Sequence, residues 1–110
     1  HRVLIDRLDE EILQKVTARM EISERIGLFK QAHNIAILQP ERWRTIMQAA
    51  HGMGKDLGLS RHFIQALMDA VHDESIRKQT EVWEREQLAA GYQGSTKNVE
   101  GSLDTGHGTI

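Results

Sequence analysis

The chain has 110 residues, enough for one small domain, and its 39% hydrophobic and 27% charged residues are an ordinary balance for a soluble globular protein. A formal net charge of −2 leaves no overall electrostatic footprint for nucleic acid or an anionic membrane, so any basic site must be local. The absence of cysteine excludes disulfides and thiolate chemistry. No apolar run reaches the roughly 18 residues of a membrane span, and no signal peptide is visible. We therefore expect a cytoplasmic protein.

Residues 2–32 are predicted to form one long helix. Its apolar positions recur in steps of three and four and form a single stripe with two cations: Ile5, Leu8, Ile12, Val16, Arg19, Ser23, Ile26 and Lys30. Gly27 interrupts this helix at a cost of about 1 kcal/mol relative to alanine, and close packing of another helix would be a reason to tolerate it. A helix of about 46 Å with so wide an apolar surface exceeds what two shorter helices can cover, which predicts a homodimer built on it.

The next segments predict two further helices. Residues 33–39 form a loop, and Pro40 suits the first position of a second helix that runs to about Leu57. Gly58 fits the left-handed cap after this helix, and Ser60 is a good N-cap for the third. The third helix again has helical spacing, with Phe63, Ile64, Leu67, Met68, Val71, Ser75, Ile76, Gln79 and Trp83. The predicted fold is all-α, with helices in the order long, medium, long.

The composition changes at Gly91. The last 20 residues contain five glycines, two serines and three threonines, with little to bury. We therefore predict a domain over residues 1–90 and a disordered tail over residues 91–110. The chain starts at His1 without a methionine, and Arg2 already looks helical, which suggests a domain cut from a longer protein.

Two cations on the core-facing stripe indicate chemistry. Arg19 and Lys30 are 11 residues apart, which places them within about 20° of each other on a helix. A charge among apolar residues is costly unless it is paired. Either these side chains extend to the rim or pair with an acid on another helix, or their counter-charge is an anionic ligand.

Later segments supply polar groups of the same kind. Arg42 lies in the first turn of the second helix, where helix N-termini favour anions, although a solvated arginine beside Glu41 explains it as well. Ser75 and Gln79 are stacked one turn apart, as a ligand-binding pair or as a polar pair inside a bundle. Taken together, the cations and neutral donors predict a site for a small dianion. Six histidines form no ligand pair on one helix face, so we expect neither a metal nor a cofactor.

The order of these residues resembles the all-α chorismate mutases over roughly residues 2–83. Four segments carry the resemblance: Arg2-x2-Ile5-Asp6-x-Leu8-Asp9-x2-Ile12; Ala18-Arg19-Met20 followed by Ile26-Gly27-x2-Lys30; Ile37-Leu38-Gln39-Pro40-Glu41-Arg42; and Glu74-Ser75-Ile76-x2-Gln79. Each segment alone is weak, but four in order with matching spacing are specific. The resemblance implies an intertwined homodimer that rearranges chorismate to prephenate, with neither cofactor nor metal.

The resemblance also implies roles for individual residues. Arg19, with Arg2 from the other subunit, would hold the two carboxylates of chorismate. Arg2 precedes Arg19 by 17 residues, about 25 Å along a helix, so it cannot reach a small ligand held by Arg19 of its own chain. Lys30 and Gln79 would donate to the ether oxygen as the C–O bond breaks, and substrate contacts would be completed by Arg42, Ser75 and Gln39.

Two positions depart from the family pattern. At the position of Gln39 the family often has an acid. At the position of Trp43 it usually has a glutamate, which helps to bind the substrate hydroxyl. Gln39 or Glu41 are candidates to replace that glutamate. The Gln-Pro-Glu-Arg-Trp loop resembles mutase domains fused behind a 3-deoxy-heptulosonate-7-phosphate synthase, which is consistent with an excised fusion domain. Two alternatives stay open: an isochorismate pyruvate-lyase on the same fold, and a non-catalytic helical dimerisation or regulatory module.

Overall fold

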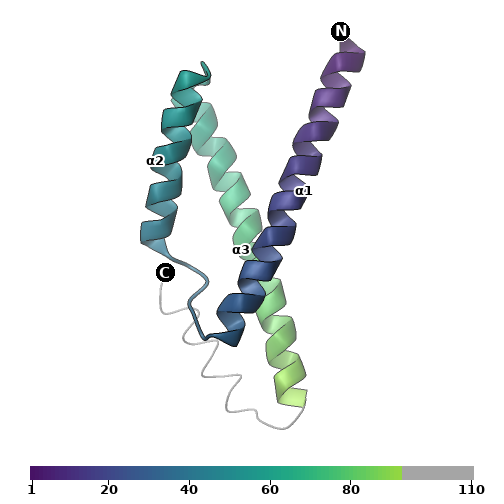
Figure 1. Cartoon of the computed structure of the whole chain (residues 1–110), viewed down its shortest axis with the longest axis vertical. Helices are drawn as coiled ribbons and strands as arrows, with labels where there is room; N and C mark the ends of the chain where they lie inside the picture. The colour runs from purple at the N-terminus through teal and green to yellow at the C-terminus, as the bar shows by residue number, and fades with distance from the viewer. Residues whose placement is uncertain (93–110) are drawn as a thin grey trace.

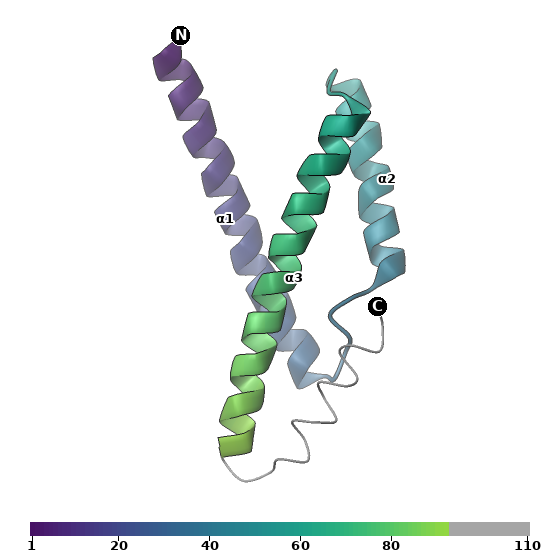
Figure 2. The same ribbon diagram turned by 180° about the vertical axis from the view of Figure 1, so that it is seen from behind.

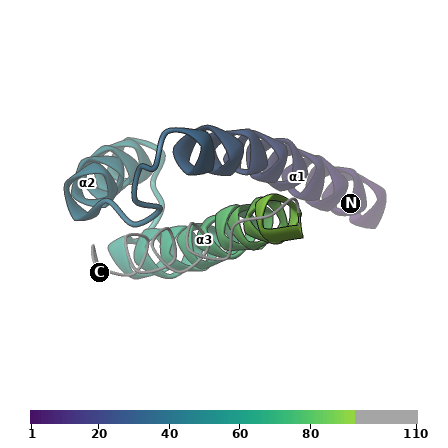
Figure 3. The same ribbon diagram turned by 90° about the horizontal axis from the view of Figure 1, so that it is seen from below.

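A computed structural model describes residues 1–92 of the chain, which form three helices and no strand: α1 (Arg2–Ala32), α2 (Pro40–Asp56) and α3 (Arg61–Tyr92). The predicted all-α class and the order long, medium, long are confirmed, with 31, 17 and 32 residues. α1 crosses α3 near the end of α1, while α2 runs beside the first half of α3 (Figure 1). Viewed from below, α1 and α2 form one layer and α3 forms the other (Figure 3).

The helix ends follow their predicted signals. Pro40 stands in the first turn of α2, which ends at Asp56 with Leu57 as its cap. Gly58 has a φ of 76°, the left-handed conformation expected of it. The Ser60 hydroxyl accepts a 3.1 Å hydrogen bond from the Phe63 backbone N–H, so it caps the start of α3 as predicted. Short turns therefore set the directions of α2 and α3.

Close packing of α1 on α3 centres on Gly27. A Cβ atom built on Gly27 would lie 2.9 Å from Cα and 3.2 Å from the carbonyl oxygen of Gln79, closer than a side chain allows. The predicted reason for a glycine here is thereby confirmed. The two backbones meet next to Lys30, and this contact sets Gln79 against α1.

The apolar core of a single chain is small. Among the residues that the structure describes, six hydrophobic residues are buried: Met20, Ile37, Met47, Ile64, Val82 and Trp83. The first half of α1 diverges from the α2–α3 pair (Figures 1 and 2). Six of its apolar side chains are more than half exposed, namely Val3, Leu4, Ile5, Leu8, Ile12 and Leu13. The predicted stripe is thus covered by its own chain only in the second half of the helix.

The predicted tail falls almost entirely outside the described residues. Its first two residues, Gly91 and Tyr92, are the last of α3, and residues 93–110 are not described. No helix within residues 1–92 has an apolar stretch long enough to cross a membrane.

Candidate active site

A cavity of about 280 Å³ lies where α1, α2 and α3 approach one another. Six of the seven residues predicted for the site line it: Arg19, Lys30, Gln39, Arg42, Ser75 and Gln79. The seventh, Arg2, does not line it, because it stands at the opposite end of α1. Six residues that are distant in the sequence thus share one cavity between the three helices.

A chain of hydrogen bonds runs along one wall of this cavity. The Lys30 ammonium donates to the Ile37 backbone oxygen at 2.8 Å and to the Gln79 side-chain oxygen at 3.0 Å. The Gln79 amide nitrogen in turn donates to the Ser75 hydroxyl at 3.2 Å, and the hydroxyls of Ser75 and Ser23 are 2.6 Å apart. These bonds fix the two residues predicted to be catalytic. Ser23 was not among the predicted site residues, although its position on the stripe beside Arg19 could have suggested it.

Two donors of this network remain available to a ligand. An ammonium has three N–H bonds and a side-chain amide has two. Within the described residues, Lys30 uses two of its three and Gln79 uses one of its two. Each residue can therefore donate one further hydrogen bond to a ligand in the cavity.

The electrostatics of the cavity favour an anion. Arg19, Lys30 and Arg42 line it, no carboxylate does, and within residues 1–92 none of the three forms a salt bridge. The pair that joins α3 to α1 is instead Lys78 with Glu24, at 3.4 Å. Within the described part of the chain, no acid on another helix pairs with Arg19 or Lys30, which had been one of the open explanations for these cations. Burial lowers the pKa of Lys30.

An aromatic pair that the sequence analysis did not assign to the site closes another part of the cavity. The rings of Trp43 on α2 and His72 on α3 are stacked, with centroids 4.0 Å apart and planes 22° apart. The pKa of His72 is lowered, chiefly by burial, so its imidazole is neutral at neutral pH. Glu41, a candidate to replace the family's glutamate, does not line the cavity but pairs with Arg44 at 3.1 Å.

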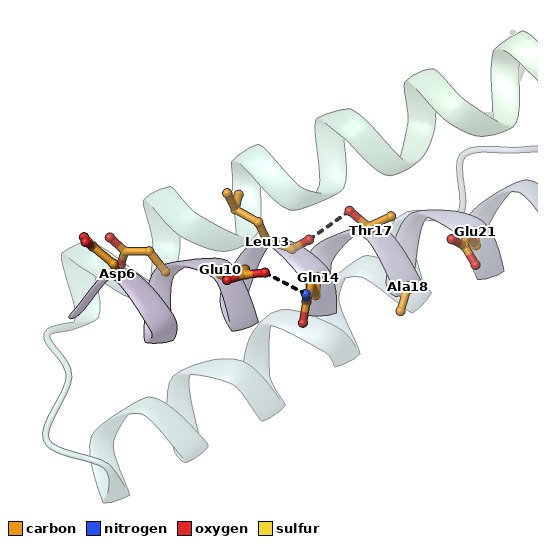
Figure 4. Close-up of a pocket in the computed structure, with 8 residues that line it drawn as sticks. Asp6, Glu10, Leu13, Gln14, Thr17, Ala18 and Glu21 are labelled. Atoms are coloured by element: carbon orange, nitrogen blue, oxygen red, sulfur yellow. Dashed lines mark hydrogen bonds between the residues drawn. The ribbon is translucent and has the colours of Figure 1, made fainter. Parts of the chain in front are cut away.

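A larger hollow of about 650 Å³ lies along the first half of α1 (Figure 4). All of its lining residues come from this one helix, and they include Asp6, Asp9, Glu10 and Glu21. Four acids would repel a dianion, and a single helix cannot enclose a small molecule. Despite its size, this hollow is a solvated helix face, and the smaller cavity is the better candidate for chemistry.

Comparisons with known proteins identify a family and several relatives. Residues 1–80 match the family described as chorismate mutase type II. The chain is 32% identical over 89 residues to a 4-amino-4-deoxychorismate mutase of Streptomyces venezuelae, covering 81% of this chain and 86% of that protein. It is 30% identical over 80 residues to a 4-amino-4-deoxychorismate mutase of Streptomyces pristinaespiralis, covering 73% of this chain and 62% of the relative. A bifunctional chorismate mutase/prephenate dehydratase of Aquifex aeolicus is 40% identical over 53 residues, which are 48% of this chain and 15% of that protein. No solved structure matches the chain.

Proposed function

Because this chain belongs to the type II chorismate mutase family, we propose that the cavity lined by Arg19, Lys30 and Gln79 is its active site. The chain is a chorismate mutase, an isomerase that rearranges chorismate to prephenate. One observation supports the placement of the site above all others. Lys30 and Gln79 are hydrogen-bonded to each other across α1 and α3, and each retains one N–H for a ligand beside Arg19 and Arg42, which form no salt bridge within residues 1–92.

The rearrangement needs no group to be transferred to the enzyme. As the C–O bond of the ether breaks, negative charge grows on the ether oxygen, and the remaining N–H groups of Lys30 and Gln79 donate to it. Donors fixed before the reaction cost no reorganisation, and each contributes roughly 3–4 kcal/mol to lowering a barrier of this kind. The hydrogen bonds to Ile37 and Ser75 hold the two donors in place.

Binding would orient the substrate for this step. Arg19 meets one carboxylate of chorismate, because a guanidinium group binds a carboxylate through paired N–H bonds, and Arg42 adds a further contact to the substrate. Ser75 and Gln39 complete the polar contacts, and the apolar walls formed by Ile26 and its neighbours hold the compact, chair-like form in which the ends of the molecule react.

A second copy of the chain is part of the proposed enzyme. The first half of α1 exposes six large apolar side chains, more than a stable isolated helix would leave in water. Pairing α1 with the α1 of a second copy covers them, and an antiparallel arrangement carries Arg2 toward the partner's cavity. Arg2 would then bind the second carboxylate there, completing an intertwined homodimer with two shared sites.

The resemblance of the segment from Gln39 to Trp43 supports one further proposal, a fusion with a 3-deoxy-heptulosonate-7-phosphate synthase in a cytoplasmic protein.

A product assay distinguishes the mutase from the two alternatives that the sequence left open, because the lyase forms a different product and the non-catalytic module forms none. The purified chain is incubated with chorismate and, separately, with isochorismate, and products are identified by chromatography and mass. We expect prephenate from chorismate. Release of pyruvate from isochorismate alone would favour the lyase, and no turnover of either compound would favour the module.

A further inference from the structure

The stacked pair of Trp43 and His72 has no part in the hydrogen-bond network of Lys30 and Gln79. Trp43 stands in the first turns of α2 and His72 near the middle of α3, and both line the cavity. Stacking at 4.0 Å restrains the imidazole, because its plane cannot rotate without losing contact with the indole. Within residues 1–92 the His72 ring forms no hydrogen bond. The ring is therefore positioned in a binding cavity with its polar atoms unused by the protein.

Few groups in the cavity can accept a hydrogen bond from a ligand. The Gln79 side-chain oxygen already accepts from Lys30, and the Ser75 hydroxyl already accepts from Gln79. Glu41 is turned away toward Arg44, and no other carboxylate lines the cavity. Among the lining side chains that carry an acceptor atom, only the His72 imidazole and the Gln39 amide make no hydrogen bond within residues 1–92. Gln39 is exposed at the start of α2, whereas His72 is half-buried.

Burial favours the neutral form of His72, whereas the charges around it act in both directions. Burial is the largest cause of its lowered pKa, and the cations Arg19 and Lys30 on α1 lower it further, against the opposing effect of Asp69 and Asp73 on its own helix. On α2, Arg42 also faces the cavity. A neutral imidazole has one nitrogen with a lone pair that accepts a hydrogen bond.

We propose that His72, held by its stack on Trp43, accepts the hydrogen bond of the chorismate hydroxyl, and that the cavity therefore selects this substrate over its 4-amino analogue. This inference rests on the proposed function of the cavity. An amine of ordinary basicity is protonated at neutral pH, so the analogue brings a further positive charge among three cations and no carboxylate. The selectivity is the reverse of what the names of the two Streptomyces relatives indicate for those proteins.

The test compares two substrates and three variants. His72→Phe keeps an aromatic ring against Trp43 but removes the acceptor, and His72→Gln restores an acceptor without the ring. His62→Phe is the matched control, because His62 is exposed on α3 and does not line the cavity. Each protein is assayed for kcat and KM with chorismate and with 4-amino-4-deoxychorismate, after thermal unfolding has established that it is folded.

We expect the wild type to prefer chorismate by at least about ten-fold in kcat/KM. We expect His72→Phe to raise the KM for chorismate about two- to ten-fold, the worth of one hydrogen bond, with a smaller change in kcat. His72→Gln should recover part of this loss, and His62→Phe should match the wild type. An equal preference for both substrates, or an unchanged KM in His72→Phe, would overturn the inference while leaving the mutase intact. If the wild type did not turn over chorismate, this result would instead refute the proposed function itself.

Discussion

The Lys30 ammonium lies 3.0 Å from the Gln79 side-chain oxygen, although 49 residues separate the two in the sequence. This hydrogen bond crosses from α1 to α3 next to Gly27, where the two backbones come closest. The position of both donors therefore depends on how closely the helices pack. Changes at the helix contact should affect the chemistry as well as the fold.

Gly27→Ala tests this dependence. The added methyl group would lie 2.9 Å from the Gln79 Cα, a backbone atom that can retreat only if α3 moves. We expect the free energy of unfolding to decrease by about 1–3 kcal/mol, as it does at other overpacked sites. We also expect kcat to fall, because Gln79 shifts away from Lys30.

Gly52→Ala provides the control for this change. No atom lies within 4 Å of the position of its Cβ, and it stands inside α2, so the variant should be about 0.5–1 kcal/mol more stable with normal turnover. Thermal unfolding and steady-state kinetics measure both effects. A Gly27→Ala protein with the stability and activity of Gly52→Ala would show that the close contact does not position Gln79.

The lowered pKa of Lys30 predicts a pH dependence. The donor is the charged ammonium, so kcat/KM should be constant near neutral pH and fall as the pH rises through the pKa of Lys30, which burial places below its ordinary value of 10.5. Lys30→Arg stays charged throughout this range and should lack the alkaline decline at a lower overall rate. A decline that persisted in Lys30→Arg would assign it to another group.

The exposed apolar half of α1 predicts the oligomeric state. Sedimentation of the wild type should give a dimer, and Ile12→Lys should give a monomer with little activity, because a lysine cannot be buried against a second copy without a partner. Leu57→Lys alters a side chain that is 68% exposed at the end of α2, away from α1, and should remain a dimer. A stable and fully active wild-type monomer would contradict the proposed assembly.

Mixing two inactive variants tests whether Arg2 serves the partner's cavity. Arg2→Ala and Arg19→Ala chains each lack one cation in every site of their own homodimers. In a mixed dimer one site carries both changes and the other carries neither, so a random mixture should recover about a quarter of wild-type activity by symmetry. If the subunits exchange and activity stays at the level of the parents, Arg2 does not act across the dimer.

Much of the fold could be predicted because its determinants are local. Pro40, Gly58 and Ser60 specify helix ends through their own backbone preferences and hydrogen bonds, and each acts as expected. Helical spacing also placed Lys30 and Gln79 on faces that meet. The spacing of apolar residues does not indicate, however, whether they are covered by the same chain or by a second copy. The exposure of Ile12 and its neighbours in a single chain therefore became visible only in the structure.

The missed parts of the site depend on tertiary contacts. His72 was one of six histidines without a ligand pair, and Trp43 was noted only as a departure from the family pattern, because a stack between α2 and α3 has no signature in either helix alone. The bond between the Ser23 and Ser75 hydroxyls likewise joins positions 52 residues apart. The spacing of the motifs identified the cations and hydrogen-bond donors as site candidates. The groups that surround them could be identified only once the structure showed how the helices cross.

If Lys30 and Gln79 together stabilise the charge that grows on the ether oxygen, the turnover of Gln79→Glu must depend on pH. An ionised glutamate repels that charge, whereas a protonated one can donate to it as the amide does. The account predicts a kcat roughly 100- to 1,000-fold below the wild type at neutral pH, with recovery at acid pH, and a Gln79→Ala variant that stays low throughout. A Gln79→Glu enzyme with the rate and pH profile of the wild type would contradict it.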